Sequence, residues 1–122
     1  MREKRKYKRI YADVVVRIAE GDLSSPTHIN TQTLNISSGG AYCPVSRYIP
    51  PLIRVQLTLL LPFHNQLHQT ETEFITCQGI VVRTEPEQES PDVEEYRIGI
   101  LFSNLDESDR RKIHRFIMEK LK

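Results

Sequence analysis

The stretch Ile10-Tyr-Ala-Asp-Val-Val-Val-Arg-Ile18 alternates apolar and polar side chains. Its apolar side chains recur at every second position: Ile10, Ala12, Val14, Val16 and Ile18. Successive side chains of an extended strand point to opposite faces, so these positions would share one face. Tyr11, Asp13 and Arg17 would lie on the other face. The stretch therefore predicts a strand with one buried face.

Further strands are expected along the rest of the chain. Residues 53–61 and 96–102 alternate as clearly as the first stretch does. Residues 28–36 are polar and rich in threonine, which is typical of a weaker or edge strand. Residues 41–44 are a short candidate strand, and residues 73–84 are rich in β-branched side chains. The count comes to about six strands.

Turns and loops separate these strands. They are segments rich in glycine, proline and polar residues, at residues 20–26, 35–40, 50–51, 62–71 and 85–94. Gly79 is different, because it stands in the middle of a predicted strand. A glycine at such a place indicates a bulge or the close approach of another backbone.

The end of the chain has a helical pattern. Asp106 is a candidate N-cap, and acidic residues follow it in the first turn. An apolar stripe then recurs at helical spacing, formed by Ile113, Phe116, Ile117 and Leu121. We expect an amphipathic helix over about residues 106–121. Six antiparallel strands and one helix predict an all-β fold, a small six-stranded barrel whose helix covers an opening or an edge.

Positive charge is concentrated at the start of the chain. Residues 1–10 hold six basic side chains against one acid, whereas the rest hold eleven basic and fifteen acidic, a net charge of −4. The whole chain, 122 residues long, has a net charge of +1. We therefore expect a basic arm, residues 1–9, and one barrel domain, residues 10–122. The arm would bind an anion, while the acidic body speaks against nucleic acid as a partner.

The absence of several patterns narrows the possible locations and functions. No apolar run approaches the length of a membrane-spanning helix, so direct membrane insertion is not expected. The charged N-terminus is unlike a secretory signal. Cys43 and Cys77 stand in apolar surroundings and predict buried free thiols, which fits a cytoplasmic location.

Catalysis and a cofactor are also not expected. His64 and His68 are four residues apart, but they fall in a predicted loop with no evident third ligand, so we expect no metal site. Neither a nucleophile elbow nor a phosphate-binding Gly-rich loop of the Walker type is found. The sequence predicts a protein that is not an enzyme.

Two short patterns carry the functional information. The first is Arg5-Lys-Tyr-Lys-Arg9, and the second is Asn35-Ile-Ser37-Ser-Gly-Gly40. If the first two strands are antiparallel neighbours, the start of one lies beside the end of the other. Arg9 would then lie close to Asn35. Both patterns are therefore expected on one patch of the barrel.

The chemistry of that patch suits a compact anionic guanine nucleotide. Arginine grips phosphate with a planar fork of donors and prefers the O6 and N7 edge of guanine. Asn35 and Ser37 lie two residues apart and would point the same way in an extended chain. Gly39 and Gly40 let the backbone come close to a ligand.

An R-x-x-x-R motif followed by [D/N]-x-S-x-x-G resembles the signature of PilZ domains, bacterial receptors for the second messenger cyclic di-GMP (c-di-GMP). The resemblance extends to Gly79-Ile-Val-Val-Arg83, to the strand Tyr96–Phe102 and to the closing helix, and covers about residues 5–121. It implies a six-stranded antiparallel PilZ-type β-barrel with a C-terminal α-helix. The ligand-binding residues that it implies are Arg5, Arg9, Asn35, Ser37 and Gly40, with Lys4, Gly39 and Arg83 as further candidates. Asn35 is a permitted variant of aspartate, and Lys4 leaves room for a stacked pair of ligands.

The resemblance implies a stand-alone adaptor that binds c-di-GMP and signals to a protein partner that the sequence does not identify. Two alternatives stay open. One is a PilZ-like interaction module that binds no nucleotide. The other is a protein that binds single-stranded nucleic acid, which the acidic body disfavours.

Overall fold

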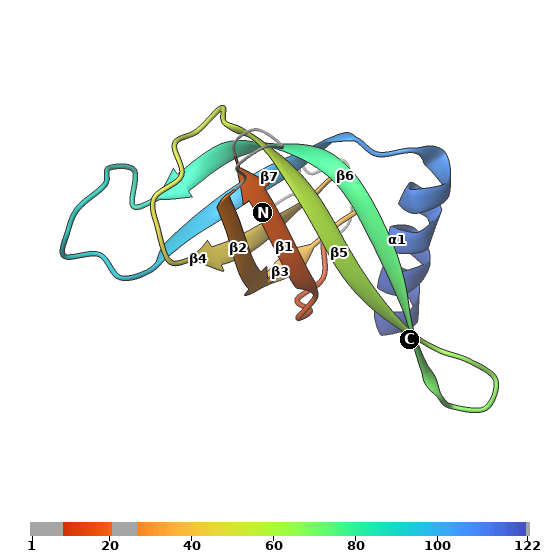
Figure 1. Cartoon of the computed structure of the whole chain (residues 1–122). Helices are drawn as coiled ribbons and strands as arrows, with labels where there is room; N and C mark the ends of the chain where they lie inside the picture. The colour runs from red at the N-terminus through yellow and green to blue at the C-terminus, as the bar shows by residue number, and fades with distance from the viewer. Residues whose placement is uncertain (1–8, 21–26, 122) are drawn as a thin grey trace, which may run out of the picture.

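The computed structural model describes residues 9–20 and 27–121. Seven strands and one helix lie in this part of the chain (Figure 1). They are β1 (Val15–Glu20), β2 (Thr27–Gln32), β3 (Asn35–Ile36), β4 (Gly40–Val45), β5 (Arg54–His64), β6 (Thr70–Glu85), β7 (Tyr96–Asn104) and α1 (Glu107–Lys120). The predictions for Lys4, Arg5 and most of the basic arm fall outside the described residues.

The strands form one antiparallel sheet in the order β2-β1-β5-β6-β7-β4-β3. The sheet curls into a half-barrel, and α1 lies beside one end of it (Figure 1). An antiparallel bridge between Ile10 and Ile36 links the segment before β1 to β3, the strand at the far edge of the sheet. The predicted all-β antiparallel fold with a C-terminal helix is confirmed.

One predicted strand, residues 28–36, is divided between β2 and β3. The Thr33 N–H donates to the Val14 carbonyl at 2.9 Å, on the side of β1, whereas the Leu34 N–H donates to the Tyr42 carbonyl at 2.8 Å. The chain therefore changes its pairing partner between these two residues. This change gives seven strands among the described residues instead of the six expected.

Two other predicted boundaries are wrong. The strand expected over residues 10–18 begins only at Val15, although Ile10, Val14, Val16 and Ile18 are all buried. The loop expected over residues 62–71 is shorter, because β5 and β6 stay paired as far as His64 and Thr70. The turn between them is held by the Asn65 carboxamide oxygen, which accepts hydrogen bonds from two backbone amides.

The helix begins and packs as the sequence indicates. The Asp106 carboxylate accepts a hydrogen bond from the Asp109 N–H at 2.9 Å, which confirms the N-cap. Ile113, Phe116 and Ile117 are buried, and the Phe116 ring meets Phe63 of β5 edge-to-face with 6.2 Å between ring centroids. Leu121 is wrongly placed in the buried stripe: it follows the last turn and is 45% exposed.

Gly79 and the two cysteines match their predictions. The strand register shifts between Gln78 and Gly79, and a Cβ on Gly79 would lie 2.6 Å from the Ile100 side chain. Cys43 and Cys77 are free and buried. Burial raises the pKa of the Cys43 thiol to about 12. Burial, with a smaller effect of the Asp109 charge, raises the pKa of Cys77 to about 11.

Within residues 9–20 and 27–121, no helix has the length and apolar character needed to cross a membrane. The same ranges contain no cluster of three or more His, Cys, Asp or Glu side chains placed to share a metal ion.

The buried Thr33 hydroxyl gives a test of the strand arrangement. It donates to the Ala12 carbonyl at 2.6 Å and accepts from the Val14 N–H at 3.0 Å. A Thr33→Val variant keeps the shape but leaves both backbone groups without this partner, so we expect a loss of about 1–3 kcal/mol in the free energy of unfolding, measured by urea denaturation. Thr76→Val, on the exposed face of β6, should change it by less than about 0.5 kcal/mol. Equal stability of the two variants would contradict the account.

Candidate functional site

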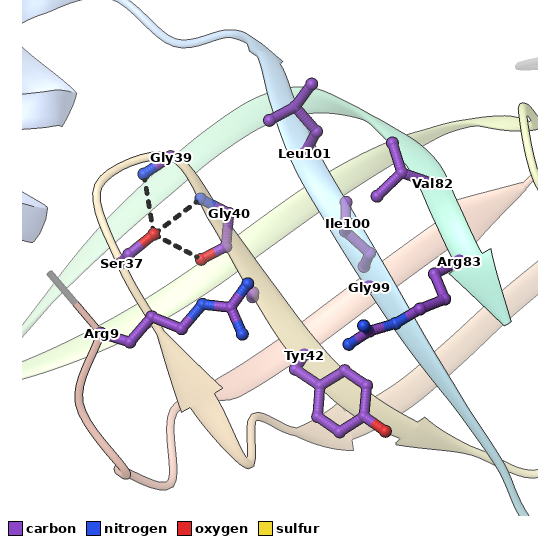
Figure 2. Close-up of a pocket in the computed structure, with 11 residues that line it drawn as sticks. Arg9, Ser37, Gly39, Gly40, Tyr42, Val82, Arg83, Gly99, Ile100 and Leu101 are labelled. Atoms are coloured by element: carbon purple, nitrogen blue, oxygen red, sulfur yellow. Dashed lines mark hydrogen bonds between the residues drawn. The ribbon is translucent and has the colours of Figure 1, made fainter. Parts of the chain in front are cut away.

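The outer faces of β4, β7 and β6 form the floor of an open pocket of about 550 Å³. These three strands are neighbours in the sheet, in that order. The pocket is lined by Arg9, Ser37, Gly39, Gly40, Ala41, Tyr42, Val82, Arg83, Gly99, Ile100 and Leu101 (Figure 2). Its size is within the range of small-molecule sites.

The position of Arg9 follows from the pairing of the next residue. The Ile10 N–H donates to the Ile36 carbonyl, and the Ile36 N–H donates to the Ile10 carbonyl, both at 3.0 Å. The two isoleucine side chains are buried, so the bridge is shielded from water. Arg9 therefore lies directly beside the turn that follows Ile36, as the strand pairing predicts.

The turn from Ser37 to Gly40 is held by its own serine. The Ser37 hydroxyl oxygen accepts hydrogen bonds from the Gly39 N–H at 3.1 Å and the Gly40 N–H at 3.2 Å (Figure 2). The Ser37 N–H donates to the Gly40 carbonyl at 2.9 Å. In this structure the buried Ser37 hydroxyl therefore shapes the turn from within.

Two neighbouring elements anchor the turn from outside. The Arg110 guanidinium of α1 donates to the Ser38 carbonyl at 2.8 Å. The Phe102 N–H of β7 donates to the Gly39 carbonyl at 2.9 Å. The turn is thus fixed to both the helix and the sheet.

Gly40 is required by the close approach of β4 to β7. A Cβ on Gly40 would lie 2.2 Å from the Ile100 carbonyl oxygen, a backbone atom that cannot rotate away. The glycine of the N-x-S-x-x-G pattern is therefore an architectural residue as well as part of the pocket lining.

The far wall of the pocket contains residues that the sequence reasoning missed or only suggested. In the strand register Gly99 lies opposite Tyr42 on one side and opposite Arg83 on the other. The pairing of β6 with β7 shifts between Val81 and Arg83, and this bulge turns Val82 and Arg83 both outward. Tyr42 and Gly99 were missed, although both stand at outward positions of predicted strands.

Most of the predicted site residues come together here. Arg9, Ser37, Gly39, Gly40 and Arg83 all line the pocket. Asn35 does not line it, but the register places Asn35 opposite Tyr42, so both side chains lie on the same face of the sheet. Arg5 and Lys4 lie outside the described residues.

The pocket combines positive charge with flat and apolar surface. Arg9 and Arg83 point toward one another from opposite sides (Figure 2), and no acidic side chain is among the described residues that line the pocket. The Arg83 guanidinium carbon lies 5.3 Å from the centroid of the Tyr42 ring. Guanidinium groups grip anions, and aromatic rings stack on planar groups. The arrangement is suited to a planar anionic ligand.

The PilZ domain family model matches residues 3–119, so this chain belongs to the PilZ domain family. The comparison by sequence with curated proteins finds no match.

Solved structures support the fold assignment. MotI/DgrA, the inhibitor of motility of Bacillus subtilis, superposes with a TM-score of 0.72 at 20% identity, over 98% of this chain and 52% of that chain. The chain thus spans about half the length of that protein. The PilZ domain of YcgR from Escherichia coli, solved with c-di-GMP, superposes with a TM-score of 0.62 at 16% identity, over 96% of this chain and 91% of that chain. MrkH of K. pneumoniae, solved as a c-di-GMP complex, superposes with a TM-score of 0.68 at 17% identity, over 98% of this chain and 52% of that chain.

Two glycines of the pocket give a matched test. Gly40→Ala forces a Cβ against the Ile100 carbonyl, and we expect it to cost about 1–3 kcal/mol or more in the free energy of unfolding. Gly99→Ala meets no atom closer than 3.8 Å and should leave stability unchanged or raise it by up to about 1 kcal/mol. Chemical denaturation of both variants checks this. A Gly40→Ala variant as stable as Gly99→Ala would contradict the close approach.

Proposed function

We propose that this protein is a receptor for c-di-GMP, and that the ligand binds in the pocket between the Ser37–Gly40 turn and Arg83. The observation that carries the proposal is the convergence of Arg9, the turn and Arg83 on one pocket with no acidic residue in its described lining. Membership of the PilZ family supports it, as do the c-di-GMP complexes of YcgR and MrkH.

The pocket offers partners for both parts of a cyclic dinucleotide. Phosphate would be gripped by Arg9 and, from the R-x-x-x-R pattern, by Arg5 of the basic arm. A guanine would lie on the flat surface around Tyr42. Asn35 lies on the same face of the sheet as Tyr42, and its carboxamide would donate a hydrogen bond to the ligand. Ser37 and Gly40 would act mainly by holding the turn in the shape that the ligand meets.

A bound ligand would change the surface that a partner protein meets. The turn is fixed to α1 through Arg110, so a ligand seated on the turn acts on a surface shared with the helix. We propose that the chain passes its signal in this way to a separate protein, as an adaptor with a basic arm, residues 1–9, and a barrel domain, residues 10–122.

A second candidate function is a protein-interaction module that binds no nucleotide. Val82 and Leu101 favour it, because these apolar side chains line the same pocket and are each 51% exposed. In that case a partner protein would cover the pocket without c-di-GMP.

Calorimetric titration with c-di-GMP tests the proposal. The intact protein should bind with micromolar or tighter affinity. Arg9→Ala and Arg5→Ala should each weaken binding about tenfold to a hundredfold, because each removes charge-assisted hydrogen bonds of about 1.5–3 kcal/mol.

Arg111→Ala is the control, since this exposed helix arginine pairs with Glu107 and lies outside the pocket. Its affinity should equal that of the intact protein. No heat of binding for the intact protein, or equal losses in Arg9→Ala and Arg111→Ala, would contradict the proposal.

A further inference from the structure

Tyr42, Arg83 and Glu85 form a linked group at the end of the pocket opposite Arg9. One oxygen of the Glu85 carboxylate, Oε1, lies 3.0 Å from Arg83 Nε and accepts a hydrogen bond from the Tyr42 hydroxyl at 3.2 Å. The Arg83 guanidinium carbon lies 5.3 Å from the centroid of the Tyr42 ring, within cation–π range. The group joins β4 to β6 across β7.

The ion pair with Glu85 is made through the Nε atom of Arg83 and not through its two terminal nitrogens. Glu85 contacts Nε, whereas the end of the planar guanidinium between its two terminal nitrogens faces a different direction. Figure 2 shows the Arg83 side chain reaching toward Tyr42, with its terminal nitrogens on the pocket side. These terminal nitrogens form the fork that recognises a pair of acceptors.

Gly99 leaves the pocket floor open next to these side chains. It lies between Tyr42 and Arg83 in the register, and the nearest atom to a Cβ built on it is 3.8 Å away. A side chain at this position would fit the fold but would fill the pocket floor. Backbone packing requires a glycine at position 40 but not at position 99. At position 99, the lack of a side chain instead keeps the pocket floor open.

We propose that Arg83 is a residue that selects guanine, that Tyr42 is the surface on which the base stacks, and that Glu85 is a positioning residue that fixes the orientation of Arg83. This inference rests on the proposed function and goes beyond it, since it adds a base-selecting residue at the end of the pocket away from the R-x-x-x-R pattern. The nearly planar fork of Arg83 meets two acceptors on guanine, O6 and N7.

Adenine offers a different edge to the same fork. It keeps the N7 acceptor but carries an amino donor where guanine has O6, so an arginine fork finds one acceptor and one clashing donor. Glutamine has the opposite preference, because its amide pairs with the adenine N6 and N7 positions. Exchange of Arg83 for glutamine should therefore shift the preference from guanine toward adenine, and not only change how tightly an anion is held.

The test is a calorimetric comparison of c-di-GMP with cyclic di-AMP on the full chain. The intact protein should prefer c-di-GMP. Arg83→Gln should lower that preference about tenfold to a hundredfold. Arg83→Lys, which keeps the charge but loses the fork, should lower it as well. Glu85→Gln should lower the preference by a smaller factor, a change that a purely structural role would not produce.

Arg97→Gln is the matched control. Arg97 also reaches a carboxylate through Nε, with 3.6 Å to Glu95 Oε2, but it lies outside the pocket lining. Its base preference should equal that of the intact protein. Folding of each variant is checked by its thermal midpoint.

The outcomes separate the two proposals. The role of Arg83 would be overturned if Arg83→Gln lost the same affinity for both ligands, or if Arg83→Gln and Arg83→Lys kept the ratio of the two affinities that the intact protein has. Neither result would contradict binding of c-di-GMP by the intact protein. Equal affinity of the intact protein for both ligands would also overturn it. Binding of neither ligand by the intact protein would overturn the proposed function and this inference together.

Discussion

The pair of backbone hydrogen bonds between Ile10 and Ile36 is the constraint on which the site depends. It joins the segment before β1 to β3 at the far edge of the sheet, and so brings the two sides of the half-barrel together. Because both side chains are buried, opening the bridge would expose apolar surface and two backbone donors at once. The same bridge places Arg9 next to the Ser37–Gly40 turn. Closure of the half-barrel therefore also brings Arg9 to the pocket that β4, β7 and β6 form.

The serine and glycine of the N-x-S-x-x-G pattern act mainly on the protein itself. The Ser37 hydroxyl already binds the Gly39 and Gly40 amides, and Gly40 allows β4 to lie against the Ile100 carbonyl. The charged side chains that line the pocket are instead Arg9 and Arg83, which belong to segments far apart in the sequence. The turn sets the geometry, and the arginines supply the attraction.

Strand identity could be predicted from the sequence wherever one face is buried and the other is not. Alternation located β5 and β7, and Asp106 marked the start of the helix. The change of partner between Thr33 and Leu34 could not be predicted, because it depends on which backbone lies opposite and leaves the alternation almost unchanged. Leu121 was misplaced for a related reason: helical spacing continues past the residue where the helix ends.

The candidate site was predictable only in its contiguous motifs. Arg9, Ser37 and Gly40 stand in recognisable patterns, and the antiparallel pairing brought them together. Tyr42 and Gly99 became part of the pocket through cross-strand register, which no local pattern contains. Arg83 faces outward beside Val82 because β6 bulges at this point. The half of the pocket formed by three strands therefore required the structure.

Backbone amide shifts of isotopically labelled protein, followed by NMR during a titration with c-di-GMP, test the central claim most directly. The account predicts saturable shifts for Gly39, Gly40 and Gly99, which line the pocket, and none for Asn30 on β2 or Lys120 at the end of α1. Shifts centred on β2, or no shifts at saturating ligand, would contradict it.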